Sequence, residues 1–153
     1  MSAIGRSTMT GSEGALAPDA VLLISRLLLG AIFLWSGFGK LTALSGFTAG
    51  MEAAGVPMAG VMAPLGAAAE FLGGLALILG AWTRLAALAL VVFTVVATLI
   101  AHRFWAVAPE QAQMQTIQFM KNLAIVGGLF ALVSAGGGRY GVDGFRQGRR
   151  ESW

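Results

Sequence analysis

The sequence contains no cysteine and a single histidine, His102. The absence of cysteine excludes disulfide exchange, thiolate metal sites and lipoprotein acylation. One histidine alone is a poor basis for a zinc site, which draws on several histidine and cysteine ligands. The one tyrosine, Tyr140, lies outside the apolar stretches. We therefore expect no metal and no intrinsic redox centre, so any redox chemistry needs a bound organic cofactor or a partner subunit.

Charged residues are also scarce. They make up 11% of the chain, whereas hydrophobic residues make up 57% and the mean hydropathy is +0.78. Soluble domains carry about 25% charged residues. Four apolar stretches cover residues 20–39, 59–81, 85–101 and 117–135, each close to the roughly 20 residues that cross a bilayer as a helix. The sequence predicts an all-α integral membrane protein folded as a four-helix bundle.

The domain organisation follows from these stretches. Residues 1–18 are rich in serine, glycine and threonine and are expected to form a disordered cytoplasmic tail. Residues 19–136 form the transmembrane domain, and residues 137–153 form a basic cytoplasmic tail. In the first outer loop, Leu44, Phe47 and Met51 recur at helical spacing, which predicts a short interfacial helix. Mostly polar residues precede the first apolar stretch, and Arg26 interrupts it. Both features argue against a cleaved signal peptide.

Basic residues are divided unequally between the two sides of the membrane. Lys40 and Arg103 lie on one side, and six arginines lie on the side of both termini: Arg6, Arg84, Arg139, Arg146, Arg149 and Arg150. The positive-inside rule then predicts cytoplasmic termini and an inner (plasma) membrane location. The net charge of +3 and the pI near 10.2 do not indicate nucleic acid, because the basic residues are spread over separate loops.

Small and polar residues share one face on each predicted helix. Small residues let membrane helices approach closely. Helix packing alone explains five of the glycines, namely Gly30, Gly37, Gly73, Gly74 and Gly128. The most economical arrangement turns all four stripes toward a polar lumen. The stripes are Arg26–Gly30–Phe33–Gly37–Lys40, Gly66–Glu70–Gly73–Gly74–Leu77, Thr94–Thr98–His102 and Lys121–Ala124–Gly128–Ala131–Ala135.

Charges inside the apolar stretches need partners or a function, because each costs roughly 2.5–3.5 kcal/mol at a helix centre. Depth along the helices predicts an ion pair between Arg26 and Glu70, which could equally be a strut without chemistry. Four polar residues are expected near the outer ends, where with Glu70 they are candidate ligand-binding residues: Lys40, His102, Lys121 and Asn122. Two roles are open for His102: it caps the end of the third apolar helix, or it carries a proton.

The sequence also resembles the DoxX family of membrane proteins over residues 24–143. The resemblance rests on the order of several motifs: Arg26-Leu-Leu-Leu-Gly30, Ser36-Gly37-Phe38-Gly39-Lys40, Glu70-Phe-Leu-Gly73-Gly74-Leu75, Arg84-Leu85-Ala86-Ala87, His102 with Phe104-Trp105, Lys121-Asn122-Leu123, and Gly138-Arg139-Tyr140 with Asp143. It implies a four-helix inner-membrane protein. It further implies an association with complexes that handle quinones, sulfur compounds or oxidative stress, although a shared fold is only an analogy for function.

Two functions remain open at this stage. The first is a membrane subunit of a quinone-linked redox complex, in which the polar residues of the bundle bind a quinone or a small anion. The second is a non-enzymatic scaffold or assembly factor that docks a partner protein. Both place the chain in the lipid bilayer with a protein partner subunit, and both leave the oligomeric state open.

Overall fold

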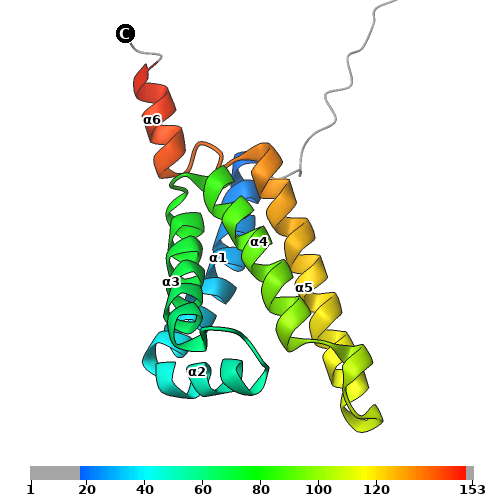
Figure 1. Ribbon diagram of the computed structural model, residues 1–153. Coiled ribbons are helices and arrows are strands. Elements are labelled where there is room, and N and C mark those ends of the chain that lie inside the picture. Colours follow the sequence, from blue (N-terminus) through cyan, green and yellow to red (C-terminus); the bar gives the residue numbers. More distant parts are fainter. Residues whose placement is uncertain (1–17, 151–153) are drawn as a thin grey trace, which may run out of the picture.

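The computed structural model describes residues 18–150, so the expected N-terminal tail lies outside the described residues (Figure 1). Four long apolar helices confirm the predicted membrane-spanning helices: α1 (Pro18–Thr42), α3 (Ala59–Leu79), α4 (Thr83–Ala101) and α5 (Pro109–Ala135). Two short helices lie between them, α2 (Leu44–Ala53) and the 3-10 turn η1 (Phe104–Ala106), and a third, α6 (Val142–Arg150), follows α5. The described residues contain no strand.

Two of the long helices extend beyond the apolar stretches that predicted them. α1 continues to Thr42, and α5 begins at Pro109 rather than near Ile117. Pro109 occupies the first turn of α5, where its fixed φ favours a helix and its missing N–H costs nothing. Glu110 follows in the same turn and interacts favourably with the helix dipole. The polar residues before Ile117 therefore continue the helix past the apolar run.

Helices α1 and α3 form the tightest pair. A Cβ atom built on Gly37 would lie 2.5 Å from the backbone nitrogen of Phe71, and one on Gly74 would lie 2.5 Å from that of Leu34. A Cβ on Gly30 would lie 2.8 Å from the carbonyl oxygen of Gly74. Each value is shorter than real Cβ contacts, so the two backbones touch only because these residues are glycines. Close approach of this kind supplies the dispersion energy that holds helices together in lipid.

This contact fixes the register between α1 and α3. In an antiparallel pair, the five residues from Gly37 to Thr42 correspond to about five residues before Phe71. The end of α1 is therefore level with about residue 66, and the first two turns of α3 extend roughly beyond it. Helix α2 lies across this overhang (Figure 1) and turns Leu44, Phe47 and Met51 toward the protein as half-buried side chains.

Helices α4 and α5 form a second pair that packs through large aliphatic side chains. The buried face of α5 carries Ile125, Val126, Leu129 and Leu132. The predicted stripe on this helix is wrong, because its members Lys121, Ala124, Ala131 and Ala135 are exposed and only Gly128 is partly covered. Branched side chains fill the space against α4 better than small ones, so they, and not the small residues, face inward.

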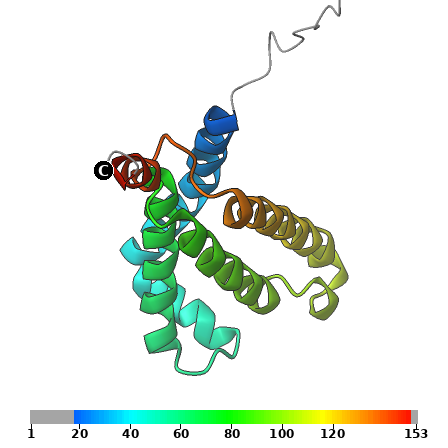
Figure 2. The ribbon, with the colours of Figure 1, turned by 90° about the horizontal axis from the view of Figure 1, so that it is seen from above.

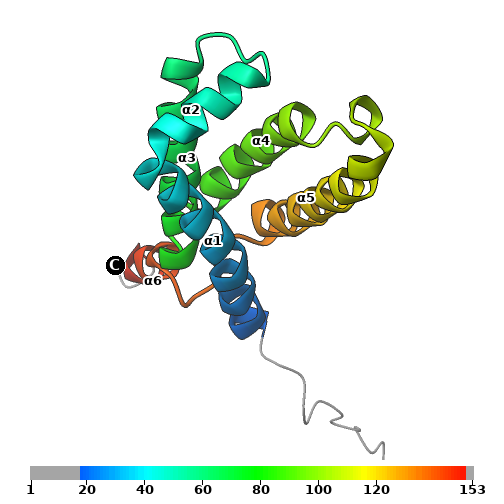
Figure 3. The same ribbon diagram turned by 90° about the horizontal axis from the view of Figure 1, so that it is seen from below.

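The two pairs do not enclose a central lumen. They meet near the end that carries Pro18 and α6, which we call the terminal end, where Phe33, Leu77, Ala87, Leu90 and Leu129 form the core. Towards the opposite end, which carries α2 and η1 and which we call the loop end, the α4–α5 pair diverges from α1 and α3 (Figures 2 and 3). The four helices therefore form two pairs that pack together at the terminal end and separate at the loop end.

The α1–α3 contact leads to a first prediction. Gly37→Ala should lower the free energy of unfolding by about 1–3 kcal/mol, because the added methyl group overlaps the backbone of Phe71. Gly39→Ala is the matched control on the same helix, since a Cβ there meets no atom within 4 Å. Thermal unfolding in detergent measures both variants, and equal melting temperatures would contradict the close approach.

Candidate functional site

The best-defined polar site of the fold is centred on Lys40, in the last turn of α1. Its Nζ atom forms an ion pair with Oε2 of Glu70 on α3, and it donates a second hydrogen bond to Oγ of Ser36 at 3.0 Å. Glu70 is buried, with 4% of its surface exposed, and the Lys40 side chain is partly exposed. A buried carboxylate of this kind requires a cation, and Lys40 supplies it.

Two aromatic rings complete this site. The Lys40 ammonium lies 5.4 Å from the ring centroid of Phe47 on α2 and 5.8 Å from that of Phe93 on α4. Four helices thus contribute to the surroundings of one ammonium group. A lysine can donate three hydrogen bonds, and two are used here, so Lys40 keeps one donor for a further acceptor. We call Ser36, Lys40, Phe47, Glu70 and Phe93 the Lys40 site.

The expected Arg26–Glu70 ion pair is wrong, because Glu70 pairs with Lys40. The reason is the register of α1 against α3. Arg26 precedes Gly37 by eleven residues and is therefore level with about residue 82, so Glu70 lies roughly 18 Å further along the axis. The apolar stretches alone do not reveal the overhang of α3, so the depth that they predict for Arg26 is too close to that of Glu70.

Arg26 instead connects helices α1 and α3 to the C-terminal segment. Its side chain is fully buried. One guanidinium nitrogen, Nη1, donates to the carbonyl of Leu77 at 3.3 Å, and Nη2 donates to that of Tyr140 at 2.8 Å. Gly80 leaves room for this group: its φ is +65°, and a Cβ there would lie 1.9 Å from Nη1 of Arg26. Backbone carbonyls, which are abundant at the end of a helix, thus accept hydrogen bonds from both terminal nitrogens of Arg26, while its buried Nε has no partner.

Asp143 is a structurally important residue whose role does not follow from the sequence. Its carboxylate accepts hydrogen bonds from the backbone N–H groups of Trp82 and Thr83, each at 2.8 Å, and from the Thr83 hydroxyl at 3.0 Å. It therefore caps the N-terminus of α4 from a distant part of the chain. The only signal in the sequence was its place in the closing motif, because no local pattern links it to Thr83.

Burial by itself raises the pKa of Asp143, but hydrogen bonds from Thr83 and Trp82 and the charge of Arg146 outweigh this effect, so the pKa lies below its usual value. The segment 137–150, expected to be a tail, thus forms a docked turn followed by α6. Asp143 also donates its backbone N–H to the carbonyl of Gly80 at 2.9 Å, which fixes the start of α6 against the turn between α3 and α4.

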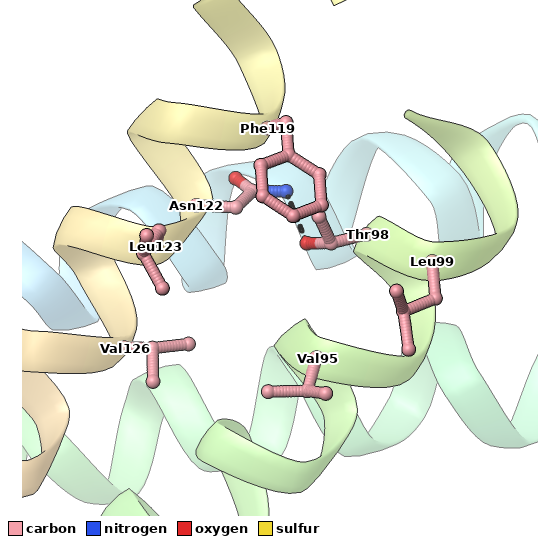
Figure 4. Close-up of a pocket in the computed structure, with 7 residues that line it drawn as sticks. All are labelled: Val95, Thr98, Leu99, Phe119, Asn122, Leu123 and Val126. Carbon is pink, nitrogen blue, oxygen red and sulfur yellow. Dashed lines mark hydrogen bonds between the residues drawn. The ribbon is translucent and has the colours of Figure 1, made fainter. Parts of the chain in front are cut away.

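The other candidate residues do not join the Lys40 site. His102 Nδ1 lies 2.9 Å from Oε1 of Gln115, across the turn between α4 and α5. Asn122 donates to the Thr98 hydroxyl at 2.9 Å, beside a small apolar cavity of about 100 Å³ between α4 and α5 (Figure 4). Lys121 is exposed on the outer face of α5. Within residues 18–150, no group of three or more acidic, histidine or cysteine residues could hold a metal ion.

The Lys40–Glu70 pair can be tested with a double-mutant cycle. Lys40→Met should lower the free energy of unfolding by about 3–5 kcal/mol, because it leaves the buried carboxylate without a cation. Adding Glu70→Gln removes that carboxylate and should restore part of the loss. Arg26→Met is the comparison: combined with Glu70→Gln, its effect should be additive within about 0.5 kcal/mol. Coupling of Glu70 to Arg26 instead of Lys40, measured by thermal unfolding, would contradict the assignment.

The capping role of Asp143 predicts a dependence of stability on pH. Because its pKa is lowered in the folded protein, its contribution is present above the unfolded-state value of about 4 and is lost as the pH falls through the folded-state value. Asp143→Asn should cost about 1–2 kcal/mol at neutral pH. It should also flatten the loss of melting temperature between neutral pH and about pH 3. Glu110→Gln, in the first turn of α5, is the control and should leave the wild-type slope unchanged.

Comparison with known proteins agrees with this fold. A family model described as DoxX matches residues 21–103, and one described as the SURF4 family matches residues 70–148. The inner membrane protein YqjF of Escherichia coli K12 is 38% identical over 125 residues, which are 82% of this chain and 91% of that protein. The inner membrane protein YphA of the same organism is 29% identical over 130 residues, which are 85% and 92% of the two chains. No solved structure matches the chain.

Each relative matches more than four fifths of this chain. Their location, together with four helices long and apolar enough to cross a bilayer, confirms a multi-pass protein of the inner membrane. The family model covers α1 to α4, which supply every residue of the Lys40 site. The chain belongs to the DoxX family.

Proposed function

We propose that this protein is the membrane subunit of a quinone-linked redox complex and that the Lys40 site binds the quinone headgroup. The observation that carries the proposal is the buried Lys40–Glu70 ion pair, with two aromatic rings near its ammonium group. A quinone offers what this site accepts, namely carbonyl oxygens for a cationic donor and a flat apolar ring for stacking against phenylalanine.

The polar groups at the site suit the proton chemistry of a quinone. Reduction to the quinol takes up two electrons and two protons, and the protons are added to the two carbonyl oxygens. Lys40 donates a hydrogen bond to one carbonyl oxygen, and the Glu70 carboxylate holds the Lys40 ammonium group in place for it. The electrons come from a partner subunit, because the side chains of this chain include no redox centre.

The site lies where a lipid-soluble molecule can reach it. Lys40 is in the last turn of α1, which ends at the loop end, where the α4–α5 pair diverges from α1 and α3 (Figure 3). Its side chain is partly exposed. His102 and Asn122 have partners of their own on the α4–α5 pair. They therefore belong to the surroundings of the ligand rather than to its direct contacts.

The quinone proposal is tested by binding. Purified protein in detergent is titrated with a short-chain ubiquinone and followed by the shift in melting temperature. The double variant Lys40→Met/Glu70→Gln, which removes both charges together, should fold but bind at least about tenfold more weakly, because it has lost a charged hydrogen-bond donor. Lys121→Met, which changes an exposed lysine in the same way, should bind like the wild type. Equal binding by the double variant would refute the site.

The scaffold function remains the second candidate, and the exposed face of α5 favours it. Lys121 lies on this face with the small residues Ala124 and Ala131, and small residues are those against which a helix of another subunit packs closely. The scaffold function predicts the opposite result for the same variants. Lys121→Met would abolish co-purification of a partner chain, whereas Lys40→Met/Glu70→Gln would retain it and no preparation would retain quinone.

A further inference from the structure

A groove at the terminal end is lined by three arginines that no function has yet explained. Its volume is about 790 Å³, and Arg84, Arg139 and Arg146 line it together with the glycines of residues 136–138. Its walls come from the turn between α3 and α4, the end of α5 and the first turns of α6. Figure 1 shows α6 rising from this end of the molecule, beside the start of α4.

The carboxylates in the groove are already engaged. Asp143 caps the N-terminus of α4, and Asp19 accepts a hydrogen bond from the backbone N–H of Arg139 at 3.0 Å. Among the side chains of residues 18–148, the one ion pair within 4 Å is that of Lys40 and Glu70. Arg84, Arg139 and Arg146 therefore form no ion pair within 4 Å in the described part of the chain. With Asp19 and Asp143 the groove is lined by three positive and two negative side chains, so it keeps a net positive charge.

Neighbouring groups hold the arginines in place without neutralising them. Arg84 donates to the carbonyl of Val133 at 3.2 Å, at the end of α5. Arg146 lies over the ring of Trp82 with its guanidinium carbon 4.9 Å from the centroid, and Arg139 lies over Tyr140 at 5.3 Å. A guanidinium group has five donors, so each of these contacts leaves donors for an anion.

The glycines keep one wall of the groove open. Gly136 has a φ of +81° and Gly138 has a φ of +69°, values that side chains other than glycine rarely adopt. A Cβ on Gly136 would lie 3.3 Å from Nε of Arg84. A larger residue at Gly136 would therefore both strain the turn and crowd the guanidinium group that faces the groove.

The groove adjoins the ends of three helices that are long and apolar enough to cross a membrane. α3 ends at Leu79, α4 begins at Thr83 and α5 ends at Ala135, so the lining residues directly follow or precede three membrane spans. Trp82 and Tyr140 are 63% and 48% exposed at the same level, as aromatic residues are at the membrane interface. Basic pockets between the ends of membrane helices are suited to anionic headgroups.

We propose that this groove binds the phosphate of an anionic membrane phospholipid. The planar guanidinium groups of Arg84 and Arg146 bind the phosphate oxygens in bidentate fashion, and the turn of residues 136–138 accommodates the rest of the headgroup. The volume lies within the range of about 300–1,000 Å³ that is typical of ligand sites. It exceeds what an inorganic phosphate ion needs, which favours the lipid as the source of the phosphate.

The full-length protein is tested in nanodiscs that contain phosphatidylcholine with a minor fraction of phosphatidylglycerol, and the retained lipid is measured by native mass spectrometry. The wild type should retain phosphatidylglycerol in preference to phosphatidylcholine. Arg84→Gln and Arg146→Gln should each lower this preference about fivefold. Arg103→Gln, at the loop end, removes the same charge and should leave the preference unchanged. The melting temperature of each variant verifies that it folds.

Two results would overturn the proposal. One is a wild type without preference for phosphatidylglycerol, or an Arg103→Gln variant whose preference falls as much as that of Arg84→Gln. In the second case the lipid would respond to the total positive charge of the protein and not to this groove. The other is displacement of the bound lipid by millimolar inorganic phosphate or glycerol phosphate, which would make a soluble anion the ligand. Retention against both competitors, with loss in the two groove variants, supports the lipid site.

Discussion

The contact between the backbones of α1 and α3 determines the rest of the structure. Gly30, Gly37 and Gly74 remove the side chains that would otherwise separate the two helices, and the resulting register decides which charged group meets which partner. It brings Lys40 to Glu70 in the middle of α3, and it brings Arg26 to the carbonyl groups at the end of α3. In lipid an unsatisfied charge is costly. A single register of α1 against α3 must therefore allow both the close packing of the glycines and the pairing of the charged groups, and the observed register allows both.

The two buried charged groups have partners of different kinds. Glu70 has a lysine from the facing helix, while Arg26 has backbone carbonyls from the end of α3 and from the segment that follows α5. The first arrangement keeps both charges beside aromatic rings, with a donor of Lys40 left over, as a ligand site requires. The second uses most of the donors of Arg26 to hold three parts of the chain together, as a structural link requires.

The sequence was sufficient to predict the elements of this fold but not their register. The four spans follow from the lengths of apolar runs, and the stripe from Arg26 to Gly37 contains the residues of α1 that are buried. The partner of Glu70 could not be predicted, because it depends on the overhang of α3, which only the contact between Gly37 and Phe71 reveals. The inward face of α5 was predicted wrongly, since small residues and branched residues compete for the interface and shape complementarity with α4 decided the outcome. Asp143 could not be predicted at all, because its partners are about sixty residues away.

The docking of the C-terminal turn against Arg26 has a consequence for how the protein is made. The ribosome synthesises α1 first and the segment around Tyr140 and Asp143 near the end, so the hydrogen bond from Arg26 to the Tyr140 carbonyl forms only when almost the whole chain has been translated. Until then the guanidinium group must find water or lipid phosphate at the membrane surface, and the start of α4 lacks its carboxylate cap. Insertion of the four spans and completion of their packing are therefore separate events. A nascent chain that stops short of Tyr140 would have crossed the membrane four times and still be unfinished.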